Sequence, residues 1–93
     1  MIIVACEIEL IIYNSNSLKD KRHVIKSIIN RIKERYNVAI GETDYLDKWN
    51  RSEISVVTVS NAKLPSEKTI DKVIGFIEKD SRVEIIHIER YVY

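Results

Sequence analysis

Cysteine, proline and glycine are scarce in this sequence. Its 93 residues contain one cysteine, one proline and two glycines. The single cysteine, Cys6, cannot form an internal disulfide or supply a cysteine-rich zinc or iron–sulfur centre. No Gly-rich phosphate loop is present either. We therefore expect no disulfide framework and no cofactor, and a reducing, cytoplasmic setting.

Long apolar runs and targeting signals are also missing. The longest apolar run lies in the first 13 residues and is interrupted by Glu7 and Glu9, which argues against a membrane span of about 20 residues. No basic leader or small-residue cleavage pattern is evident, so we expect no signal peptide. Because 45% of the residues are hydrophobic, the sequence predicts one ordered domain over residues 1–93.

The net charge of +1 conceals a strong asymmetry along the chain. Residues 18–36 carry seven lysines and arginines against Asp20 and Glu34, a local charge of +5. The remainder carries eight basic and twelve acidic residues, a charge of −4. The positive pole of the domain is therefore expected on a single element.

Hydrophobic periodicity predicts four strands and two helices. In chain order these are a strand over 2–12, a helix over 18–36 capped by Ser17, strands within 37–46 and 51–61, a helix with Pro65 in its first turn, and a strand within 82–93. The β-α-β-β-α-β order with right-handed crossovers predicts an α+β, ferredoxin-like sandwich. Its antiparallel sheet has the strand order 4-1-3-2, with both helices on one face.

The first helix has an apolar stripe that contains a lysine. Leu18, Ile25, Ile29, Ile32 and Tyr36 define the stripe, with Ile28 at its border. Lys21 falls inside the same arc. A cation placed there requires a partner, and the nearest expected carboxylates belong to the hairpin between the second and third strands. The sequence therefore predicts an ion pair of Lys21 with Glu42 or Asp44.

Four further cations line one flank of this helix over about 21 Å. They are Lys19, Arg22, Lys26 and Lys33. One interpretation is a solvated flank whose aliphatic stems cover apolar surface. The other is a binding track for a phosphate backbone, with Ser17 either a helix cap or part of an anion site at the helix start.

The predicted topology brings this helix start and the hairpin tip, residues 44–50, to one rim of the sheet. Trp49 lies near the tip and is either a plug over the core or an anchor for a partner. Glu42, Asp44 and Asp47 match no metal-binding loop, so ion pairing is preferred and no metal site is expected. His23 and His87 have no nucleophile at catalytic spacing, and we expect no enzyme.

The sheet face away from the helices is expected to carry Glu7 and Glu9 and few aromatics, unlike an RNA-recognition sheet. Ile3, Ile11, Ile85 and Tyr91 are expected among its charges, and the last strand ends in the apolar segment "RYVY". An apolar edge strand of this kind suits a subunit contact. We therefore expect a homodimer through the open face or an edge strand.

The segments "SLKDKR", "NVAIGETDYLDKW" and "VVTVSN" together resemble the YlxP-like family of bacterial domains of unknown function. The resemblance covers nearly the whole chain and implies a ferredoxin-like fold. In many bacteria the genes of this family lie between those of a translation initiation factor and a ribosome-binding factor. The resemblance thus implies a role near translation or ribosome assembly, and it supplies no catalytic residues.

Two functional hypotheses follow from the sequence. The first is a non-catalytic module that binds structured RNA or a ribosomal partner through the basic first helix and the adjoining rim, with Lys19, Arg22, Lys26, Lys33 and Trp49 at the contact. The alternative is a homodimeric ligand-sensing or scaffolding domain without nucleic-acid binding. A salt-dependent affinity distinguishes the first from the second.

Overall fold

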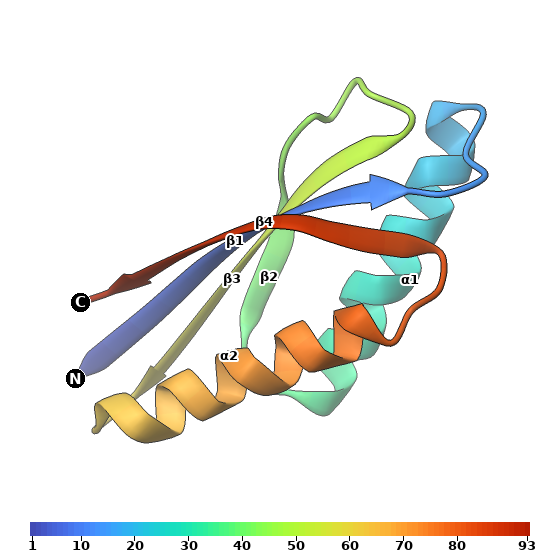
Figure 1. Cartoon of the computed structure of the whole chain (residues 1–93). Helices are drawn as coiled ribbons and strands as arrows, with labels where there is room; N and C mark the ends of the chain where they lie inside the picture. The colour runs from blue at the N-terminus through green and yellow to red at the C-terminus, as the bar shows by residue number, and fades with distance from the viewer.

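The computed structural model describes residues 1–93 and contains the six predicted elements in the predicted order (Figure 1). They are β1 (Ile2–Ile12), α1 (Leu18–Arg35), β2 (Ala39–Asp44), β3 (Arg51–Ser60), α2 (Lys63–Glu78) and β4 (Val83–Val92). Alternating apolar residues form the strands, and α1 begins at the expected cap. The helix α1 ends one residue before the predicted end, where Tyr36 adopts an extended backbone conformation.

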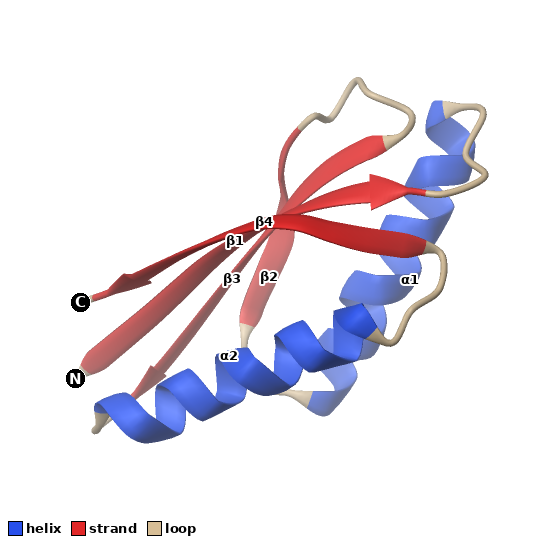
Figure 2. Ribbon diagram, viewed as in Figure 1, coloured by secondary structure: helices blue, strands red, loops and turns tan.

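The four strands form one antiparallel sheet in the order β2-β3-β1-β4, which is the predicted order read from the other edge. Both helices cover the same face of this sheet (Figure 2). The helix α2 packs on β1 and β3, and α1 lies nearer to β2. The ferredoxin-like prediction is confirmed, and β2 and β4 are the edges.

The core lies between the sheet and the helices. Every second residue of β1 from Val4 to Ile12 is buried. The helix α2 buries one face, which consists of Ser66, Ile70, Val73 and Ile77. Ile28 is fully buried, whereas Ile29 is only partly buried. The buried face therefore includes Ile28 and lies farther from Ile29 than the predicted stripe. The buried face is centred on Lys21, Ile25, Ile28 and Ile32.

A β-bulge in β4 corrects the expected composition of the open sheet face. The pairing of β4 with β1 shifts between Glu9 and Leu10, so that His87 lies opposite Glu9 and Ile85 lies opposite Leu10. Because Leu10 is a core residue, Ile85 lies on the helix-covered face and packs against the core. The sequence placed Ile85 on the open face because strict alternation cannot reveal a bulge.

Neither of the two helices combines the length and the apolar character that a membrane crossing requires.

Candidate nucleic-acid interface

The start of α1 is fixed by side chains of its own turn. The Ser17 hydroxyl accepts the backbone N–H of Asp20 at 3.1 Å, as an N-cap does. The Asp20 carboxylate accepts the backbone N–H of Asn16 at 3.1 Å. The cap prediction for Ser17 is therefore confirmed. A negative side chain already occupies this end of the helix, which favours the cap role over an anion site.

Lys21 is fully buried and closes one end of the core with its ammonium group. Its Nζ lies 3.0 Å from Oε2 of Glu42, so the ion pair expected of Lys21 forms with Glu42. The same Nζ donates to the carbonyls of Tyr45 at 2.7 Å and Arg51 at 3.2 Å. Asp44, the other candidate partner, instead accepts the backbone N–H of Tyr45 at 2.7 Å. Lys21 thus fastens the β2–β3 hairpin to α1.

The loop that Lys21 holds contains Tyr45, whose backbone conformation is unusual. Its φ of 58° is left-handed, a conformation that costs free energy for a residue with a side chain. The Tyr45 hydroxyl donates to the Glu9 carboxylate, and the Arg51 guanidinium lies 5.2 Å from the ring centroid. The hydrogen bond between Tyr45 and Glu9 lowers the pKa of Glu9 and raises that of Tyr45. The "ETDYLDKW" segment therefore has a structural role around Lys21.

The predicted rim is present in the structure. The Ser15 hydroxyl donates to the Trp49 carbonyl, which joins the β1–α1 loop to the β2–β3 loop. Both loops lie at the end of the sheet near the start of α1 (Figure 1). Trp49 is 48% exposed, so its indole does not seal the core. Lys21 and its partners close that end instead.

The exposed surface of α1 carries six cations that form no ion pair. The predicted flank of Lys19, Arg22, Lys26 and Lys33 is exposed along its whole length. None of these four residues has a carboxylate within 4.0 Å, and the same is true of Arg31 and Arg35. Of the seven basic residues of α1, only Lys21 is neutralised.

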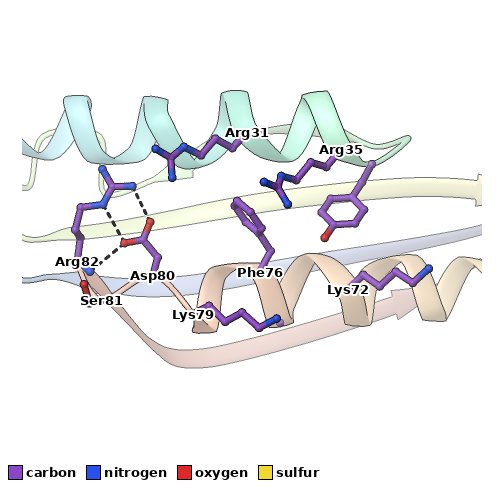
Figure 3. Close-up of a pocket in the computed structure, with 10 residues that line it drawn as sticks. Arg31, Arg35, Lys72, Phe76, Lys79, Asp80, Ser81 and Arg82 are labelled. Carbon is purple, nitrogen blue, oxygen red and sulfur yellow. Dashed lines mark hydrogen bonds and ion pairs between the residues drawn. The ribbon is translucent and has the colours of Figure 1, made fainter.

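A basic groove that sequence reasoning missed lies between the two helices. Its volume is about 710 Å³. Figure 3 shows Arg31 and Arg35 on α1 above Lys72 on α2 and Lys79 directly after it. The spacing of Lys72 and Lys79, seven residues apart on one helix face, was a signal that could have indicated it. Arg31 and Arg35 are not among the predicted contact residues, because the sequence of α1 alone does not indicate that α2 faces them.

A second hollow of about 540 Å³ lies beside the first turns of α1. Lys19 and His23 line it together with Arg82, which also lines the interhelical groove. Lys19 therefore belongs to the side of α1 that faces this hollow, and Arg82 connects the two depressions. Positive charge extends from the rim along the helical layer.

The open face of the sheet has the opposite character. Glu7 lies opposite Glu89 on β4, and Glu9 lies opposite Glu53 on β3. Burial and the neighbouring Glu7 carboxylate raise the pKa of Glu53. The Tyr91 hydroxyl donates to Glu7, and this bond raises the pKa of Tyr91 to about 12. This surface repels phosphate, as the sequence predicted.

The remaining side chains of interest are the Cys6 thiol and the pair of His87 and Glu89. No three His, Cys, Asp or Glu side chains are grouped so that they could hold a metal ion. Burial raises the pKa of the Cys6 thiol, which makes it unreactive. His87 and Glu89 lie 3.0 Å apart on the exposed sheet surface.

The fold and the charge distribution define a class: a small ferredoxin-like domain with a cationic first helix and carboxylates on its open sheet face. Residues 3–90 match the family described as "protein of unknown function (DUF503)", and the chain belongs to that family. "Uncharacterized protein YlxP" of Bacillus subtilis strain 168 is 38% identical over 78 residues, which cover 84% of this chain and 85% of that protein. The YlxP-like resemblance is confirmed.

A solved structure supports the fold. A de novo designed protein with a ferredoxin fold, determined by solution NMR, gives a TM-score of 0.57 at 18% identity. The match covers 99% of this chain and 85% of the designed chain. At this level of identity the likeness concerns the fold alone.

Proposed function

We propose that the protein is a non-catalytic, cytoplasmic binding module for structured RNA, in which α1 and the adjoining rim contact the phosphate backbone. The observation that carries the proposal is the set of six exposed, unpaired cations on one helix. Surface cations are usually interspersed with carboxylates, whereas α1 carries only Asp20 and Glu34 beside its seven cations. A polyanion that meets α1 therefore gains attraction without meeting a carboxylate cluster.

The predicted contact residues have separate parts in this proposal. Lys19, Arg22, Lys26 and Lys33 neutralise successive phosphates, which positions the RNA without reading its sequence. The half-exposed indole of Trp49 offers a surface on which an unpaired base can stack. The resemblance to a family whose genes accompany translation genes favours RNA of the ribosome as the partner.

The salt dependence of RNA affinity tests the proposal. With about four phosphates neutralised, the slope of log affinity against log salt concentration should lie between about −3 and −4. The double variant Lys19→Glu/Lys26→Glu should weaken binding at least tenfold and flatten the slope by about two units. A structured ribosomal RNA fragment is the probe, and fluorescence anisotropy is the measurement.

The control is Lys63→Glu/Lys68→Glu, which makes the same charge change at exposed positions of α2. This control should reduce affinity much less than the α1 variant. Equal losses in the two variants, or an affinity that ignores salt, would contradict a binding surface on α1.

We also propose that two copies of the chain pair. The edge strand β4 exposes Ile88 and Val92, at 37% and 44%, and is followed by Tyr93 at 70%. Its outer backbone groups have no partner in the sheet, so an antiparallel second copy can extend the ladder. Absence of RNA binding in a chain that still pairs would favour the alternative, a ligand-sensing or scaffolding dimer. Thermal shift against amino acids, nucleotides and metals would then identify its ligand.

A further inference from the structure

The groove between α1 and α2 gathers cations from three parts of the chain. Arg31 and Arg35 come from α1, Lys72 and Lys79 from the second half of α2 and the residue that follows it, and Arg82 from the α2–β4 connection (Figure 3). Only one acidic side chain, Asp80, lines the groove with them. The groove is open to solvent and lies on the opposite flank of α1 from Lys26 and Lys33.

Asp80 is already engaged within the chain. Its carboxylate accepts two bonds from the Arg82 guanidinium, at 2.9 and 2.7 Å. This pairing holds the pKa of Asp80 below its usual value and raises that of Arg82. Arg82 also lies 3.3 Å from the Ser27 hydroxyl on α1, which ties the loop to both helices. One cation and one anion therefore cancel and form a rigid end of the groove.

The other four cations have no carboxylate partner within 4.0 Å. They are Arg31, Arg35, Lys72 and Lys79. Lys72 and Lys79 are separated by about 10 Å along the axis of α2, so a single small anion cannot neutralise the whole set. Guanidinium groups also favour the bidentate geometry that phosphate oxygens offer. The charge pattern fits a ligand with several neighbouring phosphates.

The lining of the groove contains a rigid aromatic support. The Arg35 guanidinium lies 5.1 Å from the centroid of the Phe76 ring. Tyr36 meets the same ring edge-on, with centroids 6.4 Å apart. Stacking on Phe76 restricts the Arg35 side chain before any ligand arrives, which lowers the entropy cost of binding.

Gly75 is the second observation that points to a ligand. It lies inside α2, where glycine is less favourable than alanine, and it lines the groove. A Cβ atom built at Gly75 would meet nothing within 4 Å. Packing within the chain therefore does not require glycine here. The missing side chain leaves backbone exposed on the groove wall, where a ligand can approach closely.

We propose that the interhelical groove is a binding site for two or more adjacent phosphate groups, independent of the RNA contact at the rim. Arg31 and Arg35 bind phosphate oxygens from one wall, and Lys72 and Lys79 neutralise them from the other. The phosphates belong either to a free polyphosphorylated compound or to an RNA backbone. Both sources present the same chemistry to the groove.

Titration with linear tripolyphosphate, followed by calorimetry and by the backbone amide signal of Gly75, tests the site. Tripolyphosphate should bind at least tenfold more tightly than inorganic phosphate, because it reaches both walls. Arg31→Glu should weaken its binding at least tenfold, or by about 1.4 kcal/mol. Lys63→Glu is the matched control: it reverses an exposed charge at the start of α2, outside the groove lining and outside the proposed RNA contact, and it should change the affinity less than twofold.

A neutral variant separates shape from charge. Gly75→Gln places a side chain in the groove without altering the net charge and should also weaken tripolyphosphate binding. Gly75→Ala should leave most of it intact. Equal losses for Arg31→Glu and Lys63→Glu, equal affinity for phosphate and tripolyphosphate, or no effect of Gly75→Gln would overturn the proposal.

Competition with RNA distinguishes the two sources. Displacement of tripolyphosphate by RNA, with weaker RNA binding in Arg31→Glu, assigns the groove to the RNA backbone. RNA that binds without displacing tripolyphosphate assigns it to a free phosphorylated compound. Failure of RNA to bind at all would refute the proposed function. The groove proposal would still be decided by the tripolyphosphate titration.

Discussion

At the scale of single residues, Lys21 is the side chain on which the rim depends. Its buried ammonium has four oxygen neighbours, and one of them is the carboxylate of Glu42, which is itself largely buried. A buried ion pair adds little stability over apolar packing, but breaking it leaves an uncompensated charge. The cost of losing one partner is therefore much larger than the net contribution of the pair.

The variant Lys21→Met should lower the free energy of unfolding by about 3 kcal/mol, because Glu42 and the loop carbonyls lose their donor. Urea denaturation measures this loss. The double variant Lys21→Met/Glu42→Gln should recover part of it, since no unpaired charge remains. A loss below about 1 kcal/mol in the single variant would show that the ammonium does not hold the hairpin.

Glu53 illustrates the opposite case, a carboxylate that destabilises the fold at neutral pH. Its folded-state pKa is raised, so the folded chain holds this proton more firmly than the unfolded chain does. Its contribution to stability is therefore present at low pH and is lost as the pH rises from about 4.3, the usual glutamate pKa, through the folded value. Burial raises the pKa of Glu53 most, and the carboxylates of Glu7 and Asp44 add repulsion.

The variant Glu53→Gln should stabilise the fold at pH 7 by about 0.2–1 kcal/mol, the range for like charges opposed on neighbouring strands. The amide oxygen can still accept the Thr43 hydroxyl, which lies 2.8 Å from Glu53. At pH 3 the gain should vanish because the native carboxyl is protonated. Thermal unfolding at the two pH values tests this, and a gain that persists at pH 3 would assign the effect to packing.

At the scale of elements, α1 and α2 differ in their local sequence signals. The helix α1 begins at a serine cap and buries a face that includes Lys21. The helix α2 has no side-chain cap at its start and contains a glycine in its second half. Both helices form walls of the basic groove, and the glycine of α2 lies on its wall.

The variant Gly75→Ala should stabilise the protein by about 0.5–1 kcal/mol, because alanine loses less backbone entropy in a helix and its Cβ meets no neighbour. Chemical denaturation measures the change. The variant should leave RNA affinity at the rim unaltered. Destabilisation by alanine would mean that Gly75 is required by the fold and not by access to the groove.

At the scale of the whole molecule, the unpaired cations of α1 and the carboxylates at the centre of the open sheet face lie on opposite sides of the sheet. The helical layer is cationic along α1 and in the groove, and the centre of the open sheet face carries Glu7, Glu9, Glu53 and Glu89. Such a molecule orients itself in the field of a polyanion, with its helices toward the ligand. The edge strand β4 runs along a side of the sheet, so pairing there leaves both layers accessible.

Light scattering at micromolar concentration should return about twice the chain mass of 10.9 kDa. The variant Ile88→Lys should shift the mass toward the monomer by placing charge on the edge strand. Glu89→Lys is the control, since it adds the same residue type on the open face. A monomer in the unaltered protein would refute pairing through β4.

The sequence by itself determined the elements, their order and the sheet. Alternation in β1 and the apolar stripe of α1 are local patterns. Because crossover connections are right-handed, few topologies can join these elements into one sheet. The ion pair of Lys21 with Glu42 was predictable, because a cation within an apolar stripe must be paired. These features depend on residues close in sequence or on general rules of chain connection.

Only the tertiary structure decided what depends on contacts between distant segments. The bulge that moves Ile85 to the core, the three carbonyls around the Lys21 ammonium and the half-exposed position of Trp49 all result from packing. The interhelical groove also results from packing between distant segments. Its cations lie some forty residues apart along the chain, and no periodicity within one helix can show which flank of another helix it will face.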